Sequence, residues 1–140
     1  MVKHIIIIDD SEFKRDSIRS YMEKIFPDAD IAEFAALNPG LRAICMECRD
    51  RIKERPDEYL IITDMVMPVY EREMPERNAG FSVLAELSRC GMSCPAIIVS
   101  SDEADMDRAV KYYGHTLGAV KHDISVWQLD EYRRVLKDLM

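Results

Sequence analysis

The stretch that decides the fold is Ile5-Ile6-Ile7-Ile8-Asp9-Asp10, four isoleucines that end in two carboxylates. A continuous run of β-branched residues predicts a strand buried on both faces, as in parallel sheets. A second apolar run, Tyr59-Leu60-Ile61-Ile62-Thr63, ends in Asp64. Three carboxylates at neighbouring strand ends repel one another unless a cation lies among them. The sequence therefore predicts an acidic pocket at the carboxyl end of a sheet.

Strand-like and helix-like segments alternate along the chain. We expect strands at residues 2–8, 30–34, 60–63, 96–99 and 117–120. Helical spacing of apolar residues predicts a helix after each strand, including a long second helix over residues 39–55. This alternation favours an α/β fold with a parallel sheet of five strands, covered on both faces by five helices. Ligands of such folds bind at the carboxyl ends of the strands.

Length and composition exclude several classes of protein. The chain has 140 residues, enough for one domain with a real core, and a formal net charge of −7. That charge disfavours direct nucleic-acid binding, which needs a basic face. The sequence shows neither an apolar run near the ~20 residues of a membrane span nor a signal-peptide pattern, so we expect a cytoplasmic protein without membrane insertion. The four cysteines (Cys45, Cys48, Cys90 and Cys94) are expected to be free thiols, with a metal site as the less favoured alternative.

Two further polar residues follow strands of the predicted sheet. Ser100 follows the fourth strand and Lys121 ends the fifth. A lysine supplies a compact positive charge for a phosphoryl oxygen, a serine hydroxyl donates a hydrogen bond to it, and a carboxylate can be the nucleophile. Taken singly, each residue is better explained as a helix cap, a turn residue or a surface charge. Taken together with the acidic pocket, they indicate phosphoryl transfer assisted by Mg²⁺.

The sequence resembles a response-regulator receiver domain, the phospho-accepting module of two-component signalling. The resemblance covers nearly the whole chain and implies a flavodoxin-like fold with strand order 2-1-3-4-5. It also implies a receiver domain similar to single-domain chemotaxis regulators. Because the predicted final helix reaches Met140, we expect a single domain over residues 1–140 with no appended effector domain. The stretches that carry the resemblance are Ile5-Ile6-Ile7-Ile8-Asp9-Asp10, Ile61-Ile62-Thr63-Asp64-Met65-Val66-Met67-Pro68, Ala79-Gly80-Phe81, Pro95-Ala96-Ile97-Ile98-Val99-Ser100-Ser101 and Gly118-Ala119-Val120-Lys121.

Carried over by position, the resemblance assigns a role to each candidate residue. Asp64 would accept the phosphoryl group, Lys121 would pair with it, and Ser100 would turn toward it after transfer. The implied Mg²⁺ ligands are the carboxylates of Asp9, Asp10 and Asp64 and the backbone carbonyl of Val66. The implied donor is a sensor histidine kinase or a histidine phosphotransfer protein, and the output is contact with a downstream target protein. Whether the protein forms a homodimer stays an open question.

Three features depart from the family pattern. His122 follows the lysine where the family usually has proline, and Gly118 stands where the family has its switch aromatic. Candidates for replacing that aromatic are Tyr112, Tyr113 and His115. An extra stretch, residues 69–79, is favoured as a solvated loop over a lid above Asp64.

The output surface and the exact function leave alternatives open. We expect output through the fourth helix, fifth strand and fifth helix, which offer Arg108, Lys111, Arg133, Arg134, Trp127 and Tyr132. Core packing is the favoured interpretation of Trp127. The chain is interpreted as a switch, not a turnover enzyme. The alternatives are a phosphorelay shuttle, a receiver cut from a larger regulator or hybrid kinase, a Mg²⁺-dependent phosphatase with an aspartyl nucleophile, and a phosphate-independent docking domain.

Overall fold

The computed structural model describes residues 1–113 and 117–140, with the backbone alone at residues 103 and 110–113. Its main sheet has five parallel strands: β1 (His4–Ile8), β2 (Asp30–Phe34), β3 (Tyr59–Asp64), β6 (Ala96–Ser100) and β7 (Leu117–Lys121). They lie in the order β2-β1-β3-β6-β7, which is 2-1-3-4-5 when the strands of this sheet are counted along the chain. The predicted flavodoxin-like order is therefore confirmed.

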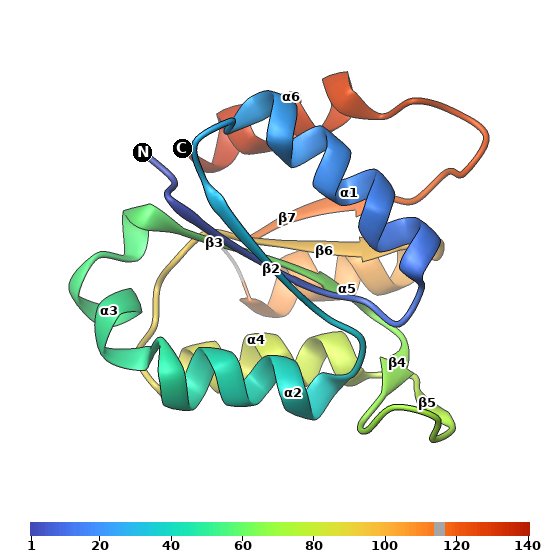
Figure 1. Ribbon diagram of the computed structural model, residues 1–140. Helices are drawn as coiled ribbons and strands as arrows, with labels where there is room; N and C mark the ends of the chain where they lie inside the picture. The colour runs from blue at the N-terminus through green and yellow to red at the C-terminus, as the bar shows by residue number, and fades with distance from the viewer. Residues whose placement is uncertain (114–116) are drawn as a thin grey trace.

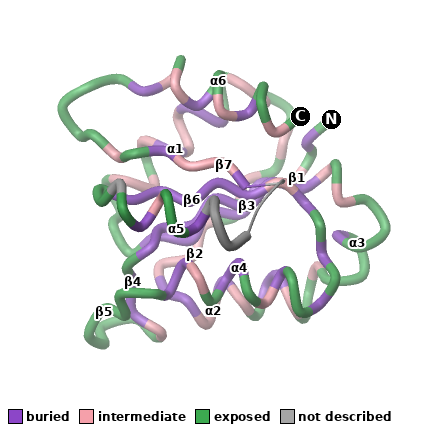
Figure 2. The backbone as a smooth tube through the Cα atoms, turned by 180° about the vertical axis from the view of Figure 1, so that it is seen from behind, coloured by how far each residue is buried: buried purple, intermediate pink, exposed green. Residues whose placement is uncertain are grey.

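Helices cover both faces of the sheet (Figure 1). On one face lie α1 (Glu12–Ile25) and α6 (Leu129–Leu139); on the other lie α2 (Leu37–Arg42), α3 (Arg49–Glu54), α4 (Ala79–Arg89) and α5 (Glu103–Tyr113). Successive side chains of a strand point to opposite faces, so a strand between two helical layers needs apolar residues at every position. Ile7 and Ile62 pack toward α1 and α6, while Ile6 and Ile61 pack toward the other layer. Figure 2 shows the resulting buried strands at the centre of the molecule.

The long second helix predicted over residues 39–55 is interrupted. After α2 the chain makes a π-helical turn, Ala43–Glu47, before α3 begins. The N–H of Cys48 donates to the carbonyl of Ala43 at 2.9 Å, which closes this wider turn. Ile44 and Ile52 are nevertheless both fully buried, so the interrupted helix still packs on the sheet. A 3₁₀ turn, Pro56–Glu58, then leads into β3.

The stretch after β3 is more ordered than the predicted solvated loop. Two short strands, β4 (Met67–Pro68) and β5 (Pro75–Glu76), pair antiparallel and form a hairpin that extends beside α2 (Figure 1). The N–H of Asn38 donates to the carbonyl of Val69 at 2.9 Å, and its side-chain amide donates to the Tyr70 hydroxyl at 2.6 Å. Residues 71–78 are exposed, as the interpretation as a solvated loop predicts, while the pairing of β4 with β5 gives the stretch more regular structure than a loop alone.

Two aromatic residues near the C-terminus differ in burial from what the sequence predicts. Trp127 precedes α6 and is 60% exposed, so its interpretation as a core residue is wrong. Its ring meets the edge of Tyr21, with centroids 4.6 Å apart. Tyr132 is completely buried and stacks on the same Tyr21, so it belongs to the core and offers no surface anchor. None of the helices described here is both long and apolar enough to cross a bilayer.

Candidate functional site

The three predicted acidic residues converge at the carboxyl end of the sheet. Asp9 and Asp10 directly follow β1, Asp64 is the last residue of β3, and these two strands pair with Ile8 opposite Thr63. One carboxylate oxygen from each acid lies within 4.8 Å of the other two. Asp9 and Asp64 are buried, whereas Asp10 is exposed to solvent. The pocket therefore has two buried walls and one side open to water.

Backbone contacts fix the orientation of the two buried acids. The N–H of Ser11 donates to Asp9 Oδ1 at 2.9 Å, and the N–H of Met65 donates to Asp64 Oδ1 at 2.8 Å. Ser11 also caps α1, because its hydroxyl accepts the N–H of Lys14 at 3.2 Å. The same short loop thus holds Asp9 and starts the helix that borders the pocket.

Gly80 allows the first turn of α4 to approach the end of β3. A Cβ at this position would lie 2.6 Å from the carbonyl oxygen of Asp64 and 2.9 Å from Met65 Cα. The Gly80 N–H donates to the carbonyl of Met65 at 3.0 Å. A larger residue would push α4 away from the strand end, since the atoms in contact belong to the backbone.

A lysine that sequence reasoning did not assign to the site lies inside the pocket. The ammonium of Lys14 is 3.0 Å from Asp9 Oδ2 and 3.0 Å from Asp64 Oδ1, and its side chain is only 12% exposed. From the sequence, Lys14 stood out only as a basic residue where a capping box carries an acid. The available signal was its position in the first turn of a helix that begins directly after an acidic strand end.

Burial and the neighbouring charges shift the pKa values in the pocket. Burial, followed by the carboxylate of Asp9, raises the pKa of Asp64 to about 6, although Lys14 opposes this change. Burial likewise raises the pKa of Asp9. Burial disfavours the charged form of Lys14, but Asp64 and Asp9 outweigh it and raise the pKa of this ammonium above its ordinary value. One firmly protonated lysine thus faces three acids.

The oxygen atoms of this pocket fit a small, hard cation. Asp9 Oδ2 is completely buried and lacks a well-oriented hydrogen-bond donor in the described part of the chain, even with the Lys14 ammonium close by. Mg²⁺ favours carboxylate oxygens and keeps several waters, which the exposed side at Asp10 leaves room for. Val66, whose carbonyl is the other predicted ligand, lies in the bend that follows β3. Its part in the metal site stays a prediction.

Ser100 and Lys121 lie at the ends of the next two strands. They are partners in the register of β6 and β7, and Asp64 is paired with Val99, the residue before Ser100. The Ser100 hydroxyl is buried and accepts the N–H of Asp102 at 3.0 Å. The backbone carbonyl of Lys121 accepts the side-chain amide of Gln128 at 2.8 Å, while the lysine as a whole is exposed. The topology thus brings both residues to the same edge of the sheet as the acids.

The two departures around Lys121 have structural explanations. His122 donates its backbone N–H to the carbonyl of Ser100 at 2.9 Å, a bond that proline has no hydrogen to make, and no cis peptide bond occurs among the described residues. At Gly118, a Cβ would clash with Val135 Cγ1, so α6 occupies the space that a side chain would need. The side chains of Tyr112 and Tyr113, and all of His115, lie outside the described residues.

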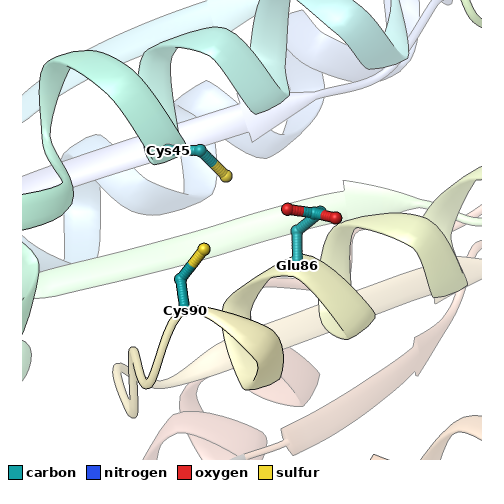
Figure 3. Close-up of side chains that lie close together, drawn as sticks. All are labelled: Cys45, Glu86 and Cys90. Atoms are coloured by element: carbon teal, nitrogen blue, oxygen red, sulfur yellow. The ribbon is translucent and has the colours of Figure 1, made fainter.

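A second group of metal-ligand types lies between the π-helical turn and α4 (Figure 3). Cys45, Glu86 and Cys90 each place one ligand atom within 4.8 Å of the others. Burial raises the pKa of Cys45 to about 11, so its thiol is neutral at physiological pH. Arg89 already pairs with both carboxylate oxygens of Glu86, at 2.6 and 3.2 Å. All four cysteines are free, as expected.

Comparisons with known proteins place this chain in a family. No protein-family model matches the chain. It is 31% identical over 113 residues to the chemotaxis protein CheY of Halobacterium salinarum, covering 79% of this chain and 78% of that protein. It is 27% identical over 106 residues to the Detocs response regulatory protein DtcB of Enterobacter cloacae, covering 71% of this chain and 65% of that protein.

Solved structures share the fold. A response regulator receiver domain protein from Clostridium thermocellum superposes with a TM-score of 0.66 at 18% identity, covering 99% of this chain and 94% of that one. A response regulator of Thermotoga maritima, solved in complex with Mg²⁺ and BeF, gives a TM-score of 0.64 at 16% identity, covering 99% and 100%. Together with the extended similarity to CheY, this shared architecture shows that the chain belongs to the family of response-regulator receiver domains.

Proposed function

We propose that this protein is a phosphorylation-activated switch in which Asp64 accepts a phosphoryl group in a Mg²⁺-dependent reaction. The observation that carries the proposal is the convergence of three carboxylates, two of them buried, around a single edge of the sheet. Three negative charges face the ammonium of Lys14, so the pocket has a surplus of negative charge that a divalent ion would balance. The protein would act as a switch in the cytoplasm, without multiple turnover of a small substrate.

The chemistry assigned to the site uses residues already held in place. The contacts of Asp64 with Met65 and Lys14 both use Oδ1, so we assign the attack on phosphorus to Oδ2. The new P–O bond forms as the P–N bond of the donor phosphohistidine breaks, and the imidazole leaves with the bond's electron pair and takes up a proton. With a pKa of about 6, Asp64 is mostly ionised at pH 7 and can act as the nucleophile.

The other predicted residues would stabilise the transferred group. Mg²⁺, when bound by Asp9, Asp10, Asp64 and the Val66 carbonyl, would supply neutralisation of the charge on phosphorus-bound oxygens. The Lys121 ammonium would pair with one such oxygen, and the Ser100 hydroxyl would donate to another. Ser100 would leave its contact with the Asp102 N–H to do so, which links phosphorylation to the start of α5.

Phosphorylation by a small-molecule donor tests the proposal. Acetyl phosphate should add one phosphoryl group to the wild-type protein in the presence of Mg²⁺, as measured by intact mass. Chelation of the metal should prevent labelling, and Asp64→Asn should remain unlabelled under all conditions. Labelling of Asp64→Asn to the wild-type extent would contradict the assignment of the acceptor.

An apolar surface beside the pocket fits the phosphoryl donor. Phe13, Ile124 and Trp127 are each about 60–70% exposed and line a groove of about 320 Å³ between α1 and the segment that precedes α6. Phe13 precedes Lys14 in sequence, and His122, which also lines the groove, follows Lys121. We assign this surface to the sensor histidine kinase or histidine phosphotransfer protein, because a partner seated there would reach Asp64.

The docking assignment is tested by comparing two phosphoryl donors. The double substitution Phe13→Ala and Ile124→Ala should slow transfer from the protein donor at least about tenfold, since two apolar contacts are lost. Labelling by acetyl phosphate should stay unchanged, because that donor needs no docking surface. Met46→Ala, at an exposed methionine on the opposite helical layer, provides the matched control. Equal slowing with both donors would contradict the assignment.

A further inference from the structure

The ammonium of Lys14 lies in the acidic pocket, but it has no role in the proposed phosphoryl transfer. The lysine assigned to the phosphoryl group is Lys121, at the end of β7. Lys14 comes instead from the first turn of α1, and its ammonium bridges the two buried acids at 3.0 Å from each. The pocket thus contains a positive charge of its own.

The loop after β1 fixes this ammonium and one of its acids together. Ser11 holds Asp9 Oδ1 through its backbone N–H and holds the backbone of Lys14 through its hydroxyl. With Oδ1 engaged, Oδ2 of Asp9 is the oxygen that faces the ammonium. A lysine loses considerable side-chain entropy when it is buried, so its placement here implies that the paired acids stabilise it.

The oxygens that Lys14 contacts belong to the carboxylates that a metal would need. Mg²⁺ requires oxygen ligands at about 2.0–2.1 Å in a nearly octahedral arrangement. An ammonium within 3.0 Å of both buried acids occupies the space between them, and its charge repels a divalent ion placed beside it. Asp9 and Asp64 therefore cannot hold both cations in the present arrangement.

We propose that Lys14 is a built-in competitor of Mg²⁺, which partly neutralises the pocket in the metal-free protein and must swing away from Asp9 and Asp64 before the metal binds. This inference rests on the proposed function, since it concerns the metal that phosphoryl transfer requires. It has two consequences. The affinity for Mg²⁺ is lower than the three carboxylates alone would give, and the metal-free protein is more stable than it would be with two uncompensated buried acids.

Metal binding by charge-altered variants tests the proposal. Mg²⁺ is titrated by calorimetry into wild type, Lys14→Met, Lys14→Arg and Lys24→Met. Lys14→Met removes the ammonium but keeps a side chain of similar length, and should bind Mg²⁺ at least about tenfold more tightly. Lys14→Arg keeps the charge and should retain weak binding. Lys24→Met removes the same charge from the exposed last turn of α1, about 15 Å along the helix, and should bind as wild type does.

Thermal unfolding gives an independent measure. In a chelator, Lys14→Met should melt below wild type, and Mg²⁺ should raise its melting temperature more than that of wild type. If Lys14→Met fails to fold without metal, the Mg²⁺-loaded variant is titrated with chelator, and metal release should need more chelator than for wild type. Equal Mg²⁺ affinities of wild type and Lys14→Met, with Asp64 still labelled by acetyl phosphate, would overturn the role of Lys14 alone. Absence of Mg²⁺ binding to either protein would overturn the proposed function and this inference with it.

Discussion

Two groups of side chains among the described residues bring metal-ligand atoms within 4.8 Å of one another, and they differ in charge. In the acidic pocket, the ammonium of Lys14 contacts Asp9 and Asp64, and the Asp10 carboxylate lies within 4.8 Å of theirs. In the other group (Figure 3), the thiol of Cys45 is neutral and Glu86 is paired with Arg89. Proximity alone therefore does not decide which group is the better metal site. The acidic pocket has a surplus of negative charge that a divalent ion would balance, whereas in the other group Arg89 already balances Glu86 and the Cys45 thiol keeps its proton.

The largest expected effect that tests this difference concerns the stability of the metal-free protein. Asp64 has a pKa of about 6 in the folded protein and about 3.8 when unfolded, so the folded state binds more protons between these values. Stability should therefore fall as the pH rises from about 4 to about 6. Asp64→Asn has no carboxyl group to titrate here, so it should lack the fall in stability, on the order of 3 kcal/mol, that wild type shows across these pH values without metal.

Chemical denaturation across this pH range, in the presence of a chelator, measures the effect. Glu86→Gln is the control from the other group, because its charge is already balanced by Arg89. Because Arg89 lowers the pKa of Glu86, this control should keep the wild-type fall in stability as the pH rises toward 6. If the stabilities of wild type and Asp64→Asn changed with pH in parallel, the acidic pocket would have no surplus of negative charge that the substitution could reduce.

The neutrality of the thiol group is tested by alkylation. Cys45 lines a hollow of about 640 Å³ that a small reagent can enter, and its pKa is raised from 9.0 to about 11. The lower thiolate fraction, partly offset by the greater nucleophilicity of a more basic thiolate, should slow alkylation about tenfold relative to an ordinary thiol. Iodoacetamide labelling at pH 8, followed by peptide mass, compares it with half-buried Cys48 on the same segment. Equal rates for the two cysteines would mean that Cys45 is available as a thiolate ligand.

A smaller effect is expected at the rim of the acidic pocket. Val66 follows Asp64 by two residues and is 39% exposed. An apolar side chain there would hinder a water molecule that attacks the phosphoryl group. Val66→Asn should therefore speed loss of the label from Asp64 a few fold, in a dephosphorylation time course after removal of acetyl phosphate. An unchanged lifetime would show that the Val66 side chain does not hinder hydrolysis.

Much of the fold and part of the site could be predicted because they depend on short-range patterns. The isoleucine run before Asp9 specifies a strand buried on both faces, and the order of acids, serine and lysine along the strands places them at one edge. The π-helical turn at Ala43–Glu47 could not be predicted, since the apolar spacing of the segment is compatible with a continuous helix. The exposure of Trp127 depends on where the segment before α6 crosses Tyr21, which no local pattern encodes.

Within the site, the contact of Lys14 with Asp64 could not be predicted from local sequence patterns either. Its position in the first turn of α1 was visible, but its reach to Asp64 depends on β1 and β3 lying side by side and on Ser11 setting the start of the helix. Sequence spacing relates Lys14 to Asp9 and Asp10, whereas its pairing with Asp64 joins residues 50 positions apart. Such contacts emerge only once the strands are assembled.

The most direct test compares Mg²⁺ binding after the loss of one carboxylate from each group. Calorimetric titration of Mg²⁺ into Asp10→Asn should show affinity at least about tenfold below that of wild type, because a hard cation loses one of its few protein oxygen ligands. Glu86→Gln should bind Mg²⁺ as wild type does. Equal affinity in Asp10→Asn and Glu86→Gln would contradict the claim that the surplus charge at the carboxyl ends of β1 and β3 makes the metal site.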